Sequence, residues 1–259
     1  MTLEEEEMPI RQPIVSALIV LLATFAVVAC GGDDDGSDAG LPQGGEKVDL
    51  NPAEFTTRID NPYWPMRPGS RWVYRETDSE GARQRVEVTV TRKTKRIANG
   101  VEARVVRDVV TEGGEPVEVT DDWYAQDRAG NVWYLGEDTT EYENGRPTTT
   151  AGSFEAGVDG AQPGIVMPAK PEAGQTYRQE YYRRKAEDRA EIVSLDEQAE
   201  VPFGHFPRVL MTKDLNPLEP KVLEFKFYAR GVGPVLAVSV SGGSDREELV
   251  SYRAASSPG

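Results

Sequence analysis

Val86-Glu87-Val88-Thr89-Val90-Thr91 alternates valine with a charged or hydroxylated residue over its whole length. Because successive side chains of a strand point to opposite faces, this period of two predicts a β-strand with one apolar face and one solvated face. The same alternation recurs at Trp72 and Tyr74 and across residues 236–240. No stretch of the body has the spacing of a long amphipathic helix. The sequence therefore predicts a mostly-β protein.

An internal repeat organises these predicted strands. Residues of one segment are matched in a second segment 104 positions later, in the same order and without a gap. The first set is Gly100, Arg104, Val105, Pro116, Tyr124 and Ala125, and the second is Gly204, Arg208, Val209, Pro220, Tyr228 and Ala229. Neither copy alone would cover both faces of its sheet. We expect two tandem antiparallel meanders, about residues 67–138 and 172–253, that form one pseudo-twofold curved sheet, half-open barrel or sandwich.

The connection between the two copies contains Pro163-Gly164-Ile165-Val166-Met167-Pro168, which is too apolar for a solvated linker. Long connections inside a compact domain are often functional loops. We therefore expect Ile165, Val166 and Met167 to pack against the sheet, either as a plug or as a lid at the mouth of a cleft.

The N-terminal region has the features of an export signal. The apolar stretch from Ile14 to Ala29 is shorter than the roughly 20 residues that span a bilayer as a helix, and its length suits a signal peptide. It ends in Val27-Val28-Ala29-Cys30, which resembles the lipobox of bacterial lipoproteins. The resemblance implies that residues 1–29 are removed and that Cys30 becomes the lipid-modified first residue. A single-span or uncleaved anchor is the alternative.

The residues around this signal bear on the same prediction. Glu4 to Glu7 make the extreme N-terminus acidic, so translation could begin at Met8, with Arg11 as the positive charge, rather than at Met1. Cys30 is the single cysteine, so the chain forms no internal disulfide, and lipidation would remove a reactive thiol. We expect residues 30–60 to be a flexible acidic tether, and residues 61–259 to be the body at the extracytoplasmic face of the cell membrane.

The charge of the chain argues against nucleic acid as a partner. The chain has 29 Lys+Arg and 44 Asp+Glu, a formal net charge of −15, which becomes −12 if residues 1–29 are removed with their four Glu and one Arg. A body of this charge is repelled by phosphate backbones and by anionic lipid headgroups. Its membrane contact is therefore expected through the lipid on Cys30 alone. The oligomeric state is not predicted.

Signals of catalysis are few. The single histidine, His205, follows Gly204 in a predicted turn, which excludes a site of several histidines and favours a solvated side chain. Neighbouring carboxylates such as Asp121 and Asp122 point to opposite faces of a strand, whereas glycosidases need two that face one site. We predict no metal site and no cofactor.

The segment WYAQDRAGNVWYLGED, which begins at Trp123, predicts a hairpin of two aromatic strands around a loop of Asp, Gly and Asn. Aromatic residues in strands are usually core residues. Trp123, Tyr124, Trp133 and Tyr134, together with Tyr228 of the second copy, are nevertheless our candidate ligand contacts, because they could stack on a sugar or line an apolar cleft.

This segment and residues 61–65 (NPYWP), 163–168 (PGIVMP) and 228–233 (YARGVG) resemble a family of uncharacterised exported bacterial lipoproteins. The resemblance implies no activity. Two functions remain open, of which the first is favoured because no nucleophile and base pattern is present. The first is a non-catalytic ligand-binding or envelope-assembly module whose partner is an envelope protein, glycan or lipid. The second is a carboxylate-dependent hydrolase that acts on envelope polymers.

Overall fold

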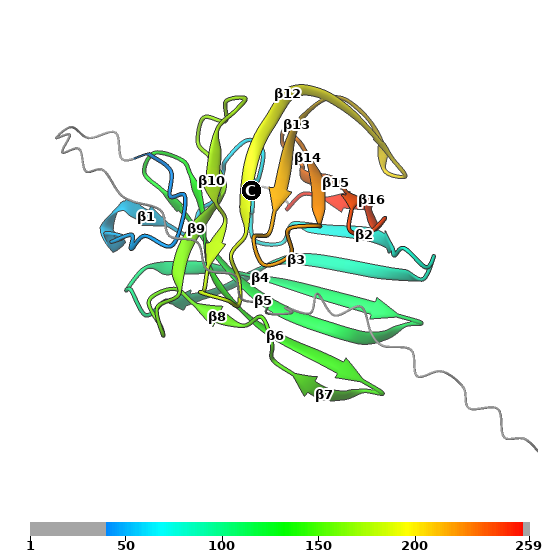
Figure 1. Ribbon diagram of the computed structural model, residues 1–259, viewed down its shortest axis with the longest axis horizontal. Helices are drawn as coiled ribbons and strands as arrows, with labels where there is room; N and C mark the ends of the chain where they lie inside the picture. Colours follow the sequence, from blue (N-terminus) through cyan, green and yellow to red (C-terminus); the bar gives the residue numbers. More distant parts are fainter. Residues whose placement is uncertain (1–39, 256–259) are drawn as a thin grey trace, which may run out of the picture.

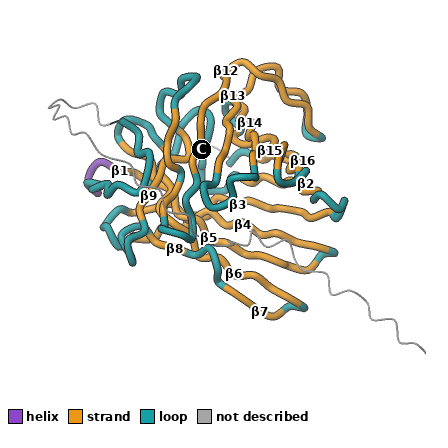
Figure 2. Tube along the Cα trace, in the orientation of Figure 1, coloured by secondary structure: helices purple, strands orange, loops and turns teal. Residues whose placement is uncertain are grey.

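The computed structural model describes residues 40–255 (Figure 1). These residues contain one short 3-10 helix, η1 (Pro52–Glu54), and no α-helix (Figure 2). None of their helices is long and apolar enough to cross a membrane. The predicted signal peptide, the lipobox and Cys30 lie outside the described residues.

The strands in chain order are β1 (Phe55–Thr56), β2 (Arg71–Thr77), β3 (Arg83–Arg96), β4 (Glu102–Glu112), β5 (Glu115–Asp127), β6 (Val132–Glu143), β7 (Arg146–Thr149), β8 (Phe154–Glu155), β9 (Gln162–Met167), β10 (Thr176–Arg178), β11 (Glu180–Tyr181), β12 (Arg189–Val201), β13 (Gly204–Leu215), β14 (Leu223–Ala229), β15 (Gly233–Ser241) and β16 (Arg246–Arg253).

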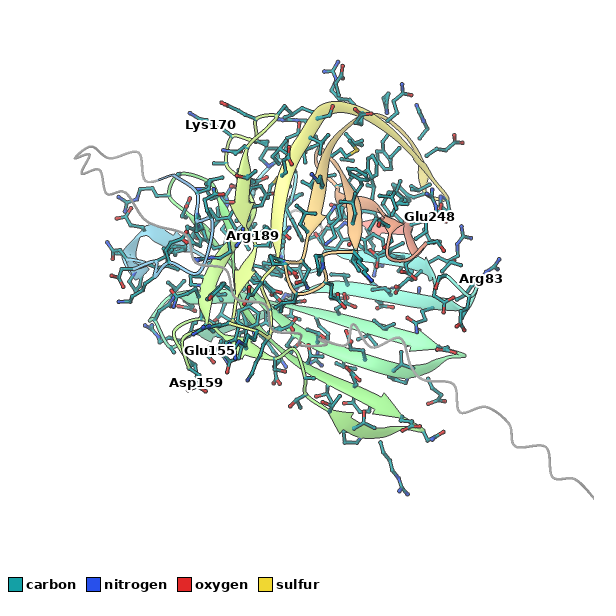
Figure 3. All side chains as sticks on the ribbon, viewed as in Figure 1. Arg83, Glu155, Asp159, Lys170, Arg189 and Glu248 are labelled. Atoms are coloured by element: carbon teal, nitrogen blue, oxygen red, sulfur yellow. The ribbon has the colours of Figure 1, made fainter. Side chains whose placement is uncertain are left out.

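All these strands belong to one antiparallel sheet with the order β10-β12-β13-β14-β15-β16-β2-β3-β4-β5-β6-β9-β11, while the short β1, β7 and β8 pair beside this path. The sheet curves into a nearly closed, barrel-like shape (Figure 1). Exposed charged side chains such as Arg83 project away from the body (Figure 3). The prediction of a mostly-β, antiparallel, curved sheet is confirmed.

The strand order contains two five-stranded meanders. One consists of β2 to β6, and the other of β10 and β12 to β15, with β16 between them. Strand β4 is the third strand of the first meander and β13 is the third strand of the second. The expected copy at residues 67–138 covers β2 to most of β6, and the expected copy at residues 172–253 covers β10 to β16. The sequence repeat itself stays a prediction.

The two edges of the sheet meet at a seam formed by residues 176–181. Strand β10 pairs with β12 at one edge and β11 pairs with β9 at the other, so only Gln179 separates the two edge strands. The guanidinium of Arg178 is buried and donates from Nε and Nη2 to the carbonyl oxygen of Pro163, over 3.1 and 2.8 Å. The Arg178 side chain therefore supplies hydrogen bonds across the seam, where paired strands elsewhere in the sheet are joined by backbone hydrogen bonds.

The N-terminal described segment also binds to this seam. The amide of Arg178 donates to the carbonyl oxygen of Pro42 over 2.6 Å, and its Nη1 donates to the carbonyl oxygen of Glu46 over 2.9 Å. Thr176 donates from Oγ1 to Oε1 of Gln43 over 2.9 Å. Within the described residues, the segment around residues 41–46 therefore packs against the body, because a buried guanidinium needs carbonyl acceptors and this segment supplies them.

Residues 59–66 extend across one end of the curved sheet, and we call this segment the plug. It is a different segment from the apolar connection at residues 165–167. Ile59 and Met66 form an antiparallel bridge at its base. Between them, the buried amide of Asn61 donates to the carbonyl oxygens of Gly130 and Pro168 over 3.1 and 3.0 Å. The NPYWP motif thus fastens the plug to two separate loops.

The apolar connection is strand β9. Ile165, Val166 and Met167 are buried, in agreement with the expected packing. Ile165 and Met167 pair with Trp133 and Val132 of β6, while β11 pairs with β9 only at Gln162 and Pro163. Residues 165–167 are therefore part of the wall of the sheet. An apolar run of this kind is typical of a buried strand. A role of residues 165–167 as a lid or plug stays a prediction.

Candidate functional site

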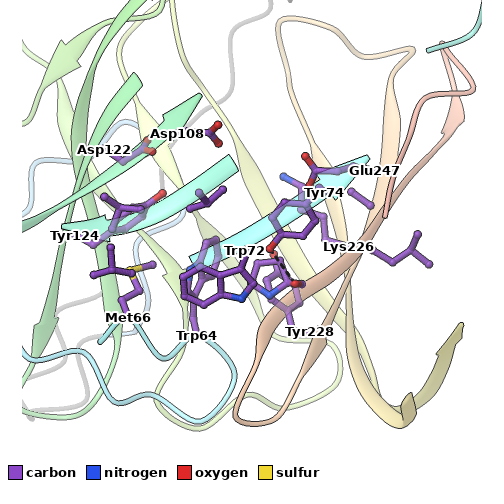
Figure 4. A pocket seen from close by; sticks show the side chains of 16 residues that line it. Trp64, Met66, Trp72, Tyr74, Asp108, Asp122, Tyr124, Lys226, Tyr228 and Glu247 are labelled. Atoms are coloured by element: carbon purple, nitrogen blue, oxygen red, sulfur yellow. Dashed lines mark hydrogen bonds between the residues drawn. The ribbon is translucent and has the colours of Figure 1, made fainter. Parts of the chain in front are cut away.

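A cavity of about 260 Å³ lies inside the curve of the sheet, next to the plug (Figure 4). Aromatic residues form much of its lining: Trp64, Trp72, Tyr74, Tyr124 and Tyr228. Four charged residues also line it: Asp108, Asp122, Lys226 and Glu247. An apolar cavity with a few convergent polar groups is the usual form of a ligand site.

A second cavity of about 450 Å³ adjoins the first at Lys226, which lines both. Its carboxylates are Glu76, Asp188, Asp214, Glu219, Glu224 and Asp245. We call the two cavities together the cup, the first being its aromatic floor and the second its acidic mouth.

The alternation of side chains along the strands produces the change from an acidic mouth to an aromatic floor. On β14, Glu224, Lys226 and Tyr228 occupy alternate positions and therefore share one face. On β2, Glu76 lines the mouth, while Trp72 lines the floor four residues earlier. Each of these strands thus carries an acidic residue at one end and an aromatic residue at the other, on the same face.

Hydrogen bonds hold two floor aromatics in place. Trp72 donates from Nε1 to the carbonyl oxygen of Val232 over 2.9 Å. The Tyr74 hydroxyl donates to the carbonyl oxygen of Pro234 over 3.0 Å (Figure 4). In contrast, the fully buried hydroxyl of Tyr228 has no hydrogen-bond partner among residues 40–255. A buried polar group without a partner costs free energy.

Lys226 is the one cation of the cup. Its Nζ lies 3.0 Å from Oδ2 of Asp214 and 3.7 Å from Oε2 of Glu224. Burial alone would lower the pKa of Lys226, but attraction to these two carboxylates outweighs it and raises the pKa well above its usual value. The lysine is therefore charged and already neutralised by its neighbours.

The three carboxyls of the floor form no ion pair with any described residue. Burial raises the pKa of Asp122 and that of Glu247 to about 8, with added repulsion from Glu137 and Glu76 respectively. Burial likewise raises the pKa of Asp108 well above its usual value, and Oδ1 of this residue has no hydrogen-bond partner in the described chain. The cup therefore holds protons near neutral pH where a ligand cation could bind.

Asp122 also belongs to a carboxyl pair. The Tyr134 hydroxyl oxygen lies 2.8 Å from Oδ1 of Asp122 and 2.7 Å from Oε2 of Glu137. A hydroxyl donates only one proton, so the second contact requires a protonated carboxyl that donates to the phenol oxygen. Burial raises the pKa of Glu137 to about 7, which is consistent with a proton held by this pair.

The five aromatic residues predicted as ligand contacts separate into two groups. Tyr124 and Tyr228 line the floor. Tyr134 lies behind Tyr124, with ring centroids 5.0 Å apart. Trp123 and Trp133 form the other group, which points to the opposite face of the sheet. Each of them is adjacent to a tyrosine of the first group, Tyr124 or Tyr134, and neighbouring residues of a strand point to opposite faces.

The two tryptophans have structural partners outside the cup. Lys95 Nζ lies 3.5 Å from the centroid of the Trp123 ring. Trp133 donates from Nε1 to Oδ2 of Asp127 over 2.8 Å. His205 is exposed at the start of β13. Residues 40–255 contain no group of three or more His, Cys, Asp or Glu side chains arranged to hold a metal ion.

Sequence reasoning missed the charged part of the site. Asp108, Asp122, Lys226 and Glu247 were among many charged residues whose default interpretation is a solvated face. The available signal was their position: Asp122 alternates with Tyr124, and Lys226 alternates with Tyr228. A charged residue two positions from a candidate core aromatic shares its face and is therefore turned inward.

Comparison with known proteins gives little further information. No protein-family model and no curated protein matches the chain. Among solved structures, it is similar to a Parabacteroides distasonis protein named as a candidate lipoprotein, at 13% identity and a TM-score of 0.40, over 74% of this chain and 98% of that chain. A likeness at this score carries no argument about the fold or activity of the present chain.

Proposed function

We propose that this chain is a lipid-anchored, extracytoplasmic binding protein whose cup takes an organic cation with an apolar or aromatic part. The observation that carries the proposal is the composition of the cup. Three carboxylates line its floor and six line its mouth, while Lys226 is the one basic residue among all its lining residues. This excess of acid over base selects for positive charge.

The raised pKa values of the floor carboxyls give this selection a mechanism. A bound cation near Asp122 and Glu247 would favour their ionised forms and would displace the protons they hold. The aromatic lining of the floor, which includes the half-buried Trp64, offers additional attraction for a cation and a surface for its apolar part.

A pair of related probes tests the proposal. Phenethylamine carries an aromatic ring and an ammonium group, whereas 2-phenylethanol has the same ring without the charge. The melting temperature of the full chain at pH 8 should rise with the amine and stay unchanged with the alcohol. The double substitution Asp122→Asn with Glu247→Gln should abolish the shift.

Asp121→Asn is the matched control, since Asp121 is adjacent on β5 and forms an ion pair with Arg107 outside the cup. This variant should bind the amine as the unmodified chain does. Equal shifts with amine and alcohol, or an equal loss in the control, would contradict selection for a cation. Because binding competes with protons, affinity should also be higher at pH 8 than at pH 6.

The second function, a carboxylate-dependent hydrolase that acts on envelope polymers, is supported by the Asp122, Tyr134 and Glu137 arrangement. Acid-base hydrolysis of a glycoside uses one protonated and one ionised carboxyl. Product release from cell-wall glycans, measured with the full chain, distinguishes the two functions. Turnover that is lost in Asp122→Asn and kept in Asp121→Asn would favour the hydrolase.

The lipid anchor is tested separately. The lipobox motif that ends at Cys30 supports the proposed anchor. Cys30→Ser should release the protein into the soluble exported fraction or leave the signal uncleaved. An intact mass that shows an unmodified Cys30 in protein extracted from membranes would exclude lipidation.

A further inference from the structure

A groove on the other side of the plug has the opposite charge. It has a volume of about 760 Å³ and is lined by four arginines, Arg58, Arg67, Arg92 and Arg104, with Asp60 as its one carboxylate. Met66 lines both this groove and the floor of the cup, so the plug separates the two. A cluster of arginines is unexpected in a chain with a formal net charge of −15.

Arg104 forms the buried part of the groove. Its guanidinium donates to the carbonyl oxygen of Thr57 over 3.3 Å, to Thr57 Oγ1 over 3.2 Å and to the carbonyl oxygen of Lys93 over 3.3 Å. The side chain belongs to a residue that is 9% exposed, yet no carboxylate of residues 40–255 forms an ion pair with it. A guanidinium has five N–H donors, so donors remain for a ligand.

The other arginines lie at the exposed rim. Arg67 and Arg92 form no ion pair with any described residue. Arg58 lies 3.3 Å from Asp60, but both side chains are largely exposed, so this pair is weak and can be replaced. The groove therefore combines one buried and two exposed guanidinium groups without anionic partners.

We propose that this groove binds a phosphate group. A buried charge is costly unless it is paired, so Arg104 lacks an anion. Several guanidinium forks around one site suit a tetrahedral oxyanion, to which arginine binds through two parallel hydrogen bonds. The phosphate could belong to a free phosphorylated compound or to a lipid headgroup, and the two sources are distinguished experimentally.

The test uses the full chain carrying Cys30→Ser, so that no covalent lipid contributes. Binding of inorganic phosphate is measured by calorimetry, and binding to phosphatidylcholine vesicles that contain phosphatidylglycerol is measured by flotation. The double substitution Arg67→Gln with Arg92→Gln should weaken binding by about tenfold or more. Because both residues are exposed, this variant should keep its melting temperature. Arg104→Gln should have the same effect on binding, with some loss of stability.

Arg146→Gln with Arg183→Gln is the matched control. Both residues are exposed and form no ion pair within residues 40–255. The control variant loses the same two positive charges as the groove variant and has the same N-terminal region. A difference in binding between the two variants therefore does not come from net charge alone. Phosphate binding that is sensitive only to the groove pair supports a free ligand, and vesicle binding alone with that sensitivity supports a headgroup. Binding of neither probe, or an equal loss in the control pair, overturns the proposal.

Discussion

The hydroxyl oxygen of Tyr134 lies 2.8 Å from Oδ1 of Asp122. The same oxygen contacts Glu137, so the phenol joins two carboxyls from β5 and β6. Burial and the mutual repulsion of these carboxyls favour a shared proton over two negative charges. The interior of the sheet thus stores protons that the unfolded chain would release.

The first prediction is that stability falls as pH rises from 5 to 8. In the unfolded chain, carboxyls ionise near pH 4. In the folded protein, burial raises the pKa of Asp122 and Glu247 to about 8 and that of Glu137 to about 7. The folded state therefore binds more protons over this interval, and the stabilisation present below about pH 4 is lost as pH approaches 8. The free energy of unfolding in urea should fall by about 2 kcal/mol or more.

Substitution assigns this pH dependence to the cup. Asp122→Asn keeps the size of the side chain and removes its titration, so the fall between pH 5 and pH 8 should be smaller. Asp121→Asn, on the opposite face of β5, should leave the fall unchanged. A pH dependence of equal size in all three proteins would show that the interior carboxyls are not its cause.

The second prediction concerns Arg178 at the seam. Arg178→Lys keeps the charge but cannot reproduce the fork that donates twice to Pro163 and also to Glu46. Buried carbonyl oxygens would lose their partners, at a cost of about 1 to 3 kcal/mol for each unsatisfied group. We expect a lower urea midpoint and faster proteolysis after residue 40. Arg189→Lys, at an exposed position on β12, should change neither measurement.

The strand architecture could be predicted from sequence, because period-two alternation is local and survives in the folded sheet. Val86, Val88 and Val90 are on the predicted strand and the first and last of them are buried. The packing of residues 41–60 against the body was harder to predict. Residues 41–60 look like a linker, since their partners, such as Arg178, lie more than a hundred positions away and no local pattern reveals them.

The candidate site likewise contains some residues that local sequence patterns predict and others that they do not. Tyr124 and Tyr228 were found as aromatic residues in strands, which is a local property. In the sequence, Asp122 and Lys226 look the same as charged residues on a solvated face of a strand. Only the closure of the sheet buries them. Whether a polar face is interior or exterior depends on sheet curvature, which no single strand encodes.

The third prediction concerns β9. Replacing Ile165, Val166 and Met167 with serine should unfold the body, because burial of each side chain is worth roughly 1.5 to 3 kcal/mol and this part of β9 pairs with β6. Three exposed valines form the control: Val158, Val240 and Val250, which are 41%, 51% and 40% exposed. Their triple serine variant should melt near the unmodified protein. A folded β9 variant with increased dye binding would instead support a mobile segment.

The fourth prediction is that Gly164→Ala opens the seam. Gly164 of β9 has no positive φ, so alanine is compatible with its backbone conformation and the effect is purely steric. A Cβ at this position would lie closer than 3.0 Å to backbone atoms of Arg178 and Gln179. Backbone atoms cannot move aside by changing a rotamer, so the strand that carries residues 176–181 must shift away from β9.

This shift would lengthen both hydrogen bonds from Arg178 to Pro163, because they cross the same gap. We expect a loss of about 1 to 3 kcal/mol, typical of overpacking. Hydrogen exchange should accelerate in residues 162–167 and 176–181 and stay slow in β3 and β4, which are distant in the strand order. Gly40→Ala is the control, since a Cβ there meets no atom within 4 Å. Uniformly faster exchange in all strands would mean that the sheet loses stability as one unit, and unchanged exchange would mean that β9 and residues 176–181 are not in close contact in solution.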